Sequence, residues 1–121
     1  MMSEEITFAD FQKLDLRVGR IVEATMVNGS EKLVRLLVDL GPAPDPDMTD
    51  SKNDTRQILA GIGKDYVIDY LLGKQIIVVS NLAPKVMLGE TSYGMLLAAD
   101  DDGRPVLLAP EQEVPEGSVV K

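Results

Sequence analysis

The pattern of apolar and polar residues predicts a chain built mainly of strands. Apolar residues recur at alternate positions from Leu16 to Met26, broken only at Arg20, and again from Leu33 to Leu40. Alternation with a period of two is typical of strands that bury one face. Three further strands are expected over residues 56–62, 75–82 and 92–99. Turns are expected at Asn28-Gly29 and at Asp102-Gly103, the second leading into the apolar run 106–108.

Two short helices complete the predicted order of elements. Thr7 and Asp10 resemble a capping box, which predicts a helix over residues 8–13. A second helix is expected from Asp65 to Leu72, because an acid opens it and Gly73 follows it. Three strands, a helix and two strands is the order of an OB-fold, a five-stranded Greek-key barrel. We therefore predict one all-β-dominated domain over residues 1–121, with one connecting helix and a short N-terminal helix.

A polar loop between two apolar runs is the most distinctive feature of the chain. Pro84 favours the start of a short helical turn, and Gly89 permits backbone angles that other residues resist. The stretch 81–99 is therefore expected to form a strand end, a helical turn, a glycine-containing loop and a strand. Binding residues are often carried on such a loop, positioned by a rigid scaffold. Its polar side chains are those of Asn81, Lys85 and Ser92.

Composition excludes several kinds of chemistry. The chain has no cysteine and no histidine, so disulfides, thiolate metal sites and catalytic triads of the Ser-His or Cys-His kind are impossible. The acidic, proline-rich stretch 42–54 suggests calcium, but an EF-hand loop needs glycine at its sixth position and an acid at its twelfth. Counted from Asp45, these positions hold Asp50 and Arg56. We therefore expect residues 42–54 to form a solvated loop without a metal ion. For the chain as a whole, we expect no cofactor and no enzymatic activity.

The net charge of −8 is concentrated in three segments. Residues 1–13, 42–54 and 100–121 carry −2, −3 and −4, and the rest of the chain carries +1. A strong basic field is therefore not indicated, although a local basic face is possible. The first residues are acidic, and no apolar run is long enough to cross a bilayer. We expect a soluble cytoplasmic protein without membrane contact.

Four motifs in a fixed order resemble a known family. They are LDLRVGRI over 14–21, SEKL over 30–33, QILAGI over 57–62 and NLAPKVMLGETSYGM over 81–95. The chain resembles the tRNA-binding domain found at the C-terminus of many methionyl-tRNA synthetases and in free-standing tRNA-binding proteins. The last motif of that family runs roughly Asn-Leu-x-Pro-Arg-Lys-Met-Arg-Gly-x-x-Ser-x-Gly-Met. The order of four motifs is specific, although each alone would be weak.

The resemblance implies an OB-fold that recognises the shape of folded tRNA near its elbow and supports aminoacylation. It also implies a homodimer and a methionyl-tRNA synthetase catalytic chain as a possible partner. An apolar surplus near both ends of the chain, including Phe8, Phe11 and Val119, agrees with a dimer. The predicted tRNA-binding residues are Lys32, Asn81, Lys85, Ser92 and Met95. Alternatively, Asn81 bonds the backbone at a strand end, Ser92 is an ordinary loop hydroxyl, and Met95 fills the core.

Two departures from the family bear on function. Val86 and Leu88 stand where many members have bases, so they either leave phosphate contacts missing or pack on the barrel or a partner. Tyr93 is the single aromatic residue near the proposed site, which favours folded tRNA over unstructured single strands. A chaperone-like or protein-interaction module on the same barrel, with weak or no tRNA binding, is the alternative function.

Overall fold

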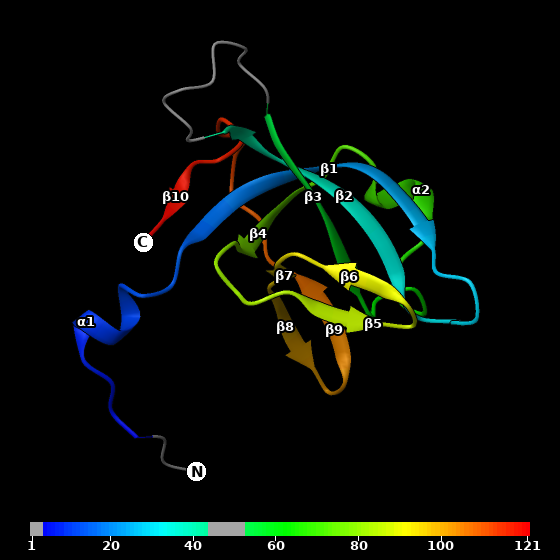
Figure 1. Ribbon diagram of the computed structural model, residues 1–121, viewed down its shortest axis with the longest axis horizontal. Coiled ribbons are helices and arrows are strands. Elements are labelled where there is room, and N and C mark those ends of the chain that lie inside the picture. Colours follow the sequence, from blue (N-terminus) through cyan, green and yellow to red (C-terminus); the bar gives the residue numbers. More distant parts are fainter. Residues whose placement is uncertain (1–3, 44–52) are drawn as a thin grey trace.

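The computed structural model describes residues 4–43 and 53–121, and strands dominate these residues (Figure 1). The main sheet is antiparallel and has the strand order β3-β2-β1-β4-β7, with β10 paired to β1. Its strands are β1 (Leu16–Met26), β2 (Val34–Pro42), β3 (Asn53–Ala60), β4 (Gln75–Val79), β7 (Met95–Leu96) and β10 (Val119–Val120).

Two hairpins and two short helices complete the described elements. The hairpins pair β5 (Lys85–Met87) with β6 (Glu90–Ser92), and β8 (Ala98–Asp101) with β9 (Arg104–Leu107). The helices are α1 (Phe8–Phe11) and α2 (Ile68–Leu71). Figure 1 shows α1 standing apart from the barrel, on the side where β10 runs. Across residues 4–43 and 53–121, none of the helices has the length and apolar character needed to cross a bilayer.

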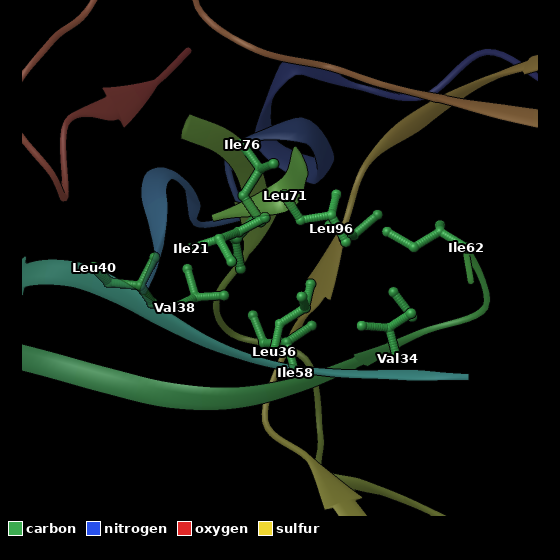
Figure 2. Packing of buried hydrophobic residues seen from close by; sticks show 12 residues of the cluster. Ile21, Val34, Leu36, Val38, Leu40, Ile58, Ile62, Leu71, Ile76 and Leu96 are labelled. Carbon is green, nitrogen blue, oxygen red and sulfur yellow. The ribbon is translucent and has the colours of Figure 1, made fainter. Parts of the chain in front are cut away.

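The core lies inside a strongly curled sheet. The register aligns Leu36 with Ile58, and both are fully buried together with Ile21 of β1 and Ile76 of β4. Figure 2 shows these side chains pointing toward one another, with Leu71 of α2 among them. The alternate residues of β2 from Val34 to Leu40 face inward, because a period of two sends every second side chain to one face. In β1 the prediction was partly wrong, because the register shifts between Ile21 and Glu23, so that Ile21 is buried while Val22 and Met26 are exposed. The predicted all-β-dominated OB-like barrel is confirmed.

A second, smaller cluster lies outside the main core. Val27, Leu33 and Leu59 are buried there, and Met87 of the β5–β6 hairpin packs against them. Leu59 belongs to the outer face of β3, since its neighbour Ile58 faces the barrel interior. The β5–β6 hairpin therefore lies on β3 and next to the β1–β2 connection, which contains residues 27–33.

Three local predictions were wrong. The expected helical turn at Pro84 is absent, because the chain enters strand β5 at Lys85. The expected strand 92–99 is broken into β6, β7 and β8, with Gly94 at φ 151° between the first two. The expected helix 65–72 is reduced to Ile68–Leu71, because Val67 is extended and the Tyr66 hydroxyl accepts from the Leu107 N–H at 3.0 Å. The stretch 41–54 is extended at both ends, in β2 and β3, and residues 44–52 lie outside the described residues.

The N-terminal cap and the two turns agree with prediction. The Thr7 hydroxyl accepts a hydrogen bond from the Asp10 N–H at 3.1 Å, and α1 begins at the next residue, Phe8. Asp102 and Gly103 have φ of 51° and 90°, as a two-residue hairpin turn requires. The chain also turns at Asn28-Gly29, where Gly29 has φ 86°.

Candidate nucleic-acid interface

The family-like loop is folded as a tight hairpin that packs on β3. Lys85 pairs with Ser92 and Met87 with Glu90, so a two-residue turn remains between β5 and β6. Leu88 and Gly89 form it with φ of 49° and 78°, both in the left-handed region that a type I′ turn requires. The side chains of Val86 and Leu88 are 67% and 62% exposed, so neither packs on its own barrel.

The start of this loop is tied to the segment before β1. Asn81 accepts from the Asp15 N–H at 2.9 Å through Oδ1 and donates to the Lys13 carbonyl at 2.6 Å through Nδ2. The Ser80 hydroxyl and N–H both donate to the Asp15 carbonyl at 2.9 Å. The structural interpretation of Asn81, as a side chain bonding backbone at a strand end, therefore holds. A contact between Asn81 and tRNA stays a prediction.

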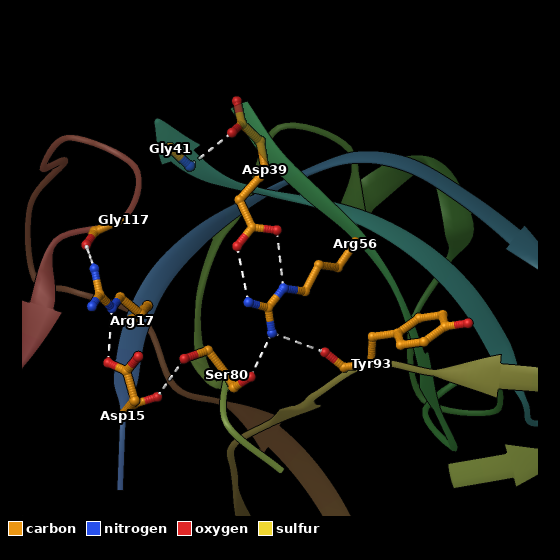
Figure 3. A network of polar contacts seen from close by, with 9 residues as sticks. Asp15, Arg17, Asp39, Gly41, Arg56, Ser80, Tyr93 and Gly117 are labelled. Atoms are coloured by element: carbon orange, nitrogen blue, oxygen red, sulfur yellow. Dashed lines mark hydrogen bonds and ion pairs between the residues drawn. The ribbon is translucent and has the colours of Figure 1, made fainter. Parts of the chain in front are cut away.

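Arg56 holds both ends of the loop and was missed by the sequence reasoning. Its Nε and Nη2 donate to the two carboxylate oxygens of Asp54 at 3.0 and 2.9 Å. Its Nη1 donates to the carbonyl of Ser80, where the loop begins, and to that of Tyr93, where it ends, the latter at 3.3 Å. Figure 3 shows the guanidinium reaching these groups from β3. The signal in the sequence was the Asp54–Arg56 spacing, which puts both side chains on one face of a strand.

Ser92 lies inside the protein. It is 2% exposed, and its hydroxyl accepts from the Leu59 N–H at 3.0 Å and donates to the Gly94 carbonyl at 2.9 Å. These bonds join β6 to β3 and fix the backbone ahead of β7. The hydroxyl is therefore already occupied, and the prediction that Ser92 contacts tRNA directly is corrected to a supporting role in the loop. The motif match could not separate these roles, because both need a hydroxyl.

The other predicted residues lie in the hairpin or near it. Lys85 is exposed and opens β5, while Met95 is half-buried in β7 opposite Val79. Lys32 is exposed in the β1–β2 connection, beside Leu33, which packs in the cluster under the hairpin. The fold thus places Lys32 beside the cluster on which the hairpin packs, and Lys85 in the hairpin itself, although the two are far apart in sequence. OB-folds bind oligonucleotides with the corresponding surface, formed by strands 2–3 and the loops beside them.

The described basic residues divide into paired and unpaired groups. Lys13 and four arginines, Arg17, Arg20, Arg56 and Arg104, form ion pairs with carboxylates. The Arg17 side chain, at 2.8 Å, holds the pKa of Asp15 below its usual value. Within residues 4–43 and 53–121, no carboxylate lies at ion-pairing distance from Lys32, Arg35, Lys64, Lys74, Lys85 or Lys121.

Three unpaired bases surround the hairpin. Arg35, on the outer face of β2, lines a groove of about 420 Å³ together with Leu88 and Glu90 of the hairpin. Lys85 lies in β5 of the hairpin itself, and Lys32 lies in the β1–β2 connection. A second groove, of about 410 Å³, lies on the β3 side and is lined by Arg56, Leu82 and Tyr93, among others. The surface around the hairpin therefore has positively charged side chains beside shallow grooves. Such a surface suits a nucleic acid, whose phosphates are negatively charged and whose bases are planar rings.

These features are those of an OB-like barrel whose hairpin end resembles a nucleic-acid-binding surface. The chain belongs to the family described as "Putative tRNA binding domain", which matches residues 16–119.

Individual relatives agree with this assignment. The chain is 44% identical over 117 residues to the methionine–tRNA ligase of Archaeoglobus fulgidus, covering 97% of this chain but 16% of the ligase. The corresponding ligase of Methanothrix thermoacetophila is 47% identical over 116 residues, covering 96% of this chain and 16% of the ligase. The chain thus spans about a sixth of the length of these enzymes.

Solved structures of similar proteins share the fold along their whole length. A MetRS related protein from Pyrococcus horikoshii superposes with a TM-score of 0.83 at 32% identity, covering 98% of this chain and 100% of that one. The chaperone CsaA from Bacillus anthracis superposes with a TM-score of 0.79 at 30% identity, with the same coverage.

Proposed function

We propose that this chain is a non-catalytic module that binds folded tRNA at the hairpin end of its barrel. The observation that carries the proposal is the location of the unpaired bases. Lys85 is part of the hairpin, Arg35 lines a groove beside its turn, and Lys32 precedes Leu33 of the cluster on which the hairpin packs. The other arginines are engaged by carboxylates. Phosphate contacts dominate the affinity of proteins for nucleic acids, so these three side chains are the main source of binding energy.

Folded tRNA is a better ligand than an unstructured strand. OB-folds that bind single strands stack successive bases on several aromatic side chains. The loop 80–95 contains one aromatic residue, Tyr93, and the two phenylalanines lie in α1. Recognition through shape, backbone and ribose hydroxyls requires no such platform. Poly-uridine of equal length should therefore bind more weakly than tRNA at the same salt concentration.

A salt series tests the proposal. Three neutralised phosphates give a slope of log affinity against log salt of about −2 to −3, at 0.7–0.9 per contact. Lys32→Ala and Lys85→Ala should each reduce the slope by about 0.7–0.9. Lys74→Ala is the matched control, because this lysine lies 4.2 Å above the ring of Tyr70 beside α2. If Lys74→Ala reduced the tRNA affinity and the salt slope as much as the other two variants do, the tRNA site would lie elsewhere.

We also propose that the module acts as a cytoplasmic homodimer that supports a methionyl-tRNA synthetase. The dimer is supported by an apolar groove of about 340 Å³, lined by Phe8, Phe11 and Leu14 near α1 and by Val119 of β10. Phe8 and Val119 are 71% and 57% exposed in the single chain. The synthetase is supported by the names of the relatives. Light scattering at micromolar concentration should give twice the chain mass of 13.2 kDa, and Phe8→Asp should give the single mass.

A chaperone-like function is the second candidate. It is favoured by the exposed apolar side chains of Val86 and Leu88 and by the similarity to a protein named as a chaperone. Under this alternative, the chain would delay aggregation of an unfolded protein, and Val86→Ser with Leu88→Ser would abolish the effect. Absence of any delay at equimolar concentration, together with salt-dependent tRNA binding, would leave the first proposal alone.

A further inference from the structure

The groove on the β3 side has a composition that phosphate binding does not explain. It measures about 410 Å³ and is lined by Thr55, Arg56, Gln57, Leu82, Pro84 and Tyr93. Leu82 and Tyr93 are each 48% exposed, so apolar and aromatic surface faces solvent there. A volume of this size lies within the range of small-ligand pockets, roughly 300–1,000 Å³.

The cation of this groove is already occupied. The Arg56 guanidinium is shared among the Asp54 carboxylate and the Ser80 and Tyr93 carbonyls, so it offers little to a phosphate. The Gln57 amide is also committed, since its Nε2 donates to the Thr91 carbonyl at 2.9 Å. The groove therefore presents apolar walls and an aromatic ring, with Thr55 as an exposed hydroxyl. Such a lining fits a flat ring with a polar edge better than an anion.

The Tyr93 ring is presented on a fixed backbone. The Tyr93 N–H donates to the Gln57 carbonyl at 2.9 Å, and the Tyr93 carbonyl accepts from Arg56 at 3.3 Å. Figure 3 shows the ring pointing away from these contacts. A backbone held on both sides loses little further freedom when a ligand stacks on the side chain. The ring thus extends from a preorganised backbone and offers a stacking surface for one planar group.

We propose that this groove holds one unpaired base of the bound tRNA, stacked on the ring of Tyr93 beside Leu82. This inference rests on the proposed tRNA-binding function and deepens it. Folded RNAs expose unstacked bases in their loops, and proteins recognise such bases by stacking them on aromatic side chains. One ring serves one base, which agrees with a module that reads the shape of a folded RNA and fixes a single nucleotide.

Fluorescence gives a direct test, because the chain contains no tryptophan. The variant Tyr93→Trp has a single indole at the groove, and its emission should be quenched saturably as tRNA is added. Tyr93→Ala should weaken tRNA binding about fivefold or more, with an unchanged salt slope, because a stacking contact releases no counterions. Tyr93→Phe should restore the affinity relative to the alanine variant. Tyr70→Ala, at a tyrosine 57% exposed on α2, is the control and should bind like the parent.

The outcomes separate this inference from the proposed function. Unchanged indole emission while tRNA binds would overturn the stacked base but leave tRNA binding intact. A shallower salt slope in Tyr93→Ala would show a phosphate in the groove and would also overturn it. Quenching by an unfolded protein as strong as that by tRNA would assign the groove to protein side chains instead. Absence of tRNA binding by the parent chain at low salt would end the proposed function and this inference together.

Discussion

Replacing Arg56 by glutamine should destabilise the barrel and loosen its binding loop. The Arg56 and Asp54 side chains are 29% and 23% exposed, and two parallel hydrogen bonds join them. Breaking a fully buried pair costs about 3–5 kcal/mol, and exposed pairs contribute about 0–1. The Arg56–Asp54 pair is partly buried, and Arg56→Gln also removes a charged donor from two carbonyls. We therefore expect the substitution to lower the free energy of unfolding by about 2–3 kcal/mol.

A thermal melt followed by circular dichroism measures this loss. For a domain of this size, each kcal/mol lowers the melting temperature by about 4 °C, so a fall of about 8–12 °C is expected. Arg104→Gln is the matched control, because its pair with Asp101 is 62% and 60% exposed. That variant should melt within about 2 °C of the parent.

A double variant separates the loss of contacts from the cost of an unpaired acid. Asp54→Asn combined with Arg56→Gln removes both charges, so it should recover part of the melting temperature lost in the single variant. The tRNA affinity should fall in Arg56→Gln, because Ser80 and Tyr93 are no longer tied together. If Arg56→Gln melted like Arg104→Gln and bound tRNA like the parent, the two loop ends would be held by other contacts and the reasoning would be wrong.

Two further predictions concern the hairpin, and a third concerns the ion pair between Arg20 and Glu116. Leu88→Asn should raise the melting temperature by about 2–4 °C, because Asn tolerates the left-handed backbone at φ 49° better than Leu. Val86→Lys with Leu88→Arg should tighten tRNA binding without lowering the melting temperature, and should steepen the salt slope by up to about 1.4–1.8 if both new side chains reach phosphates. A stable variant with unchanged affinity would refute this prediction. Hydrogen bonding from Arg20 lowers the pKa of Glu116, so the stability it contributes is complete above its ordinary value of 4.5 and is lost as pH falls through the lowered pKa. Between pH 6 and pH 3, the melting temperature should therefore change less with pH for Glu116→Gln than for the parent. Glu113→Gln is the control, because the Glu113 side chain is 76% exposed, and it should behave like the parent.

The barrel was predictable because its information is local and periodic. Every second residue of β2 is apolar from Val34 to Leu40, and a strand that buries one face needs nothing more specific. The register shift of β1 after Ile21 is not visible in such a pattern. The short elements were harder to predict. Pro84 is as acceptable before a strand as at the start of a helical turn, and the hairpin that follows depends on Leu88 entering the left-handed region. Sequence rules do not expect leucine there.

The candidate site was predictable by resemblance and only partly by chemistry. The motif located the loop, but it could not tell that Ser92 faces inward, because burial depends on how β6 lies against β3. The role of Arg56 in holding both ends of the loop was not predicted for the same reason. Its partners Ser80 and Tyr93 lie 24 and 37 residues away in sequence and meet it only through the closure of the barrel. Contacts set by long-range closure leave no local pattern.

An acidic protein that binds tRNA must keep its cations free of its own acids. In this chain, Arg17, Arg20, Arg56 and Arg104 are neutralised by nearby carboxylates, whereas Lys32, Arg35 and Lys85 have no carboxylate at ion-pairing distance among the described residues. Few phosphate contacts make for modest affinity and a shallow salt dependence. Weak sites gain most from tethering, because a second contact on one particle acts at an effective concentration that is often millimolar. A dimer with two such ends, or attachment to a synthetase that holds the same tRNA, would supply that gain. A reduced basic hairpin is therefore compatible with a working tRNA-binding module that acts as one of several contacts.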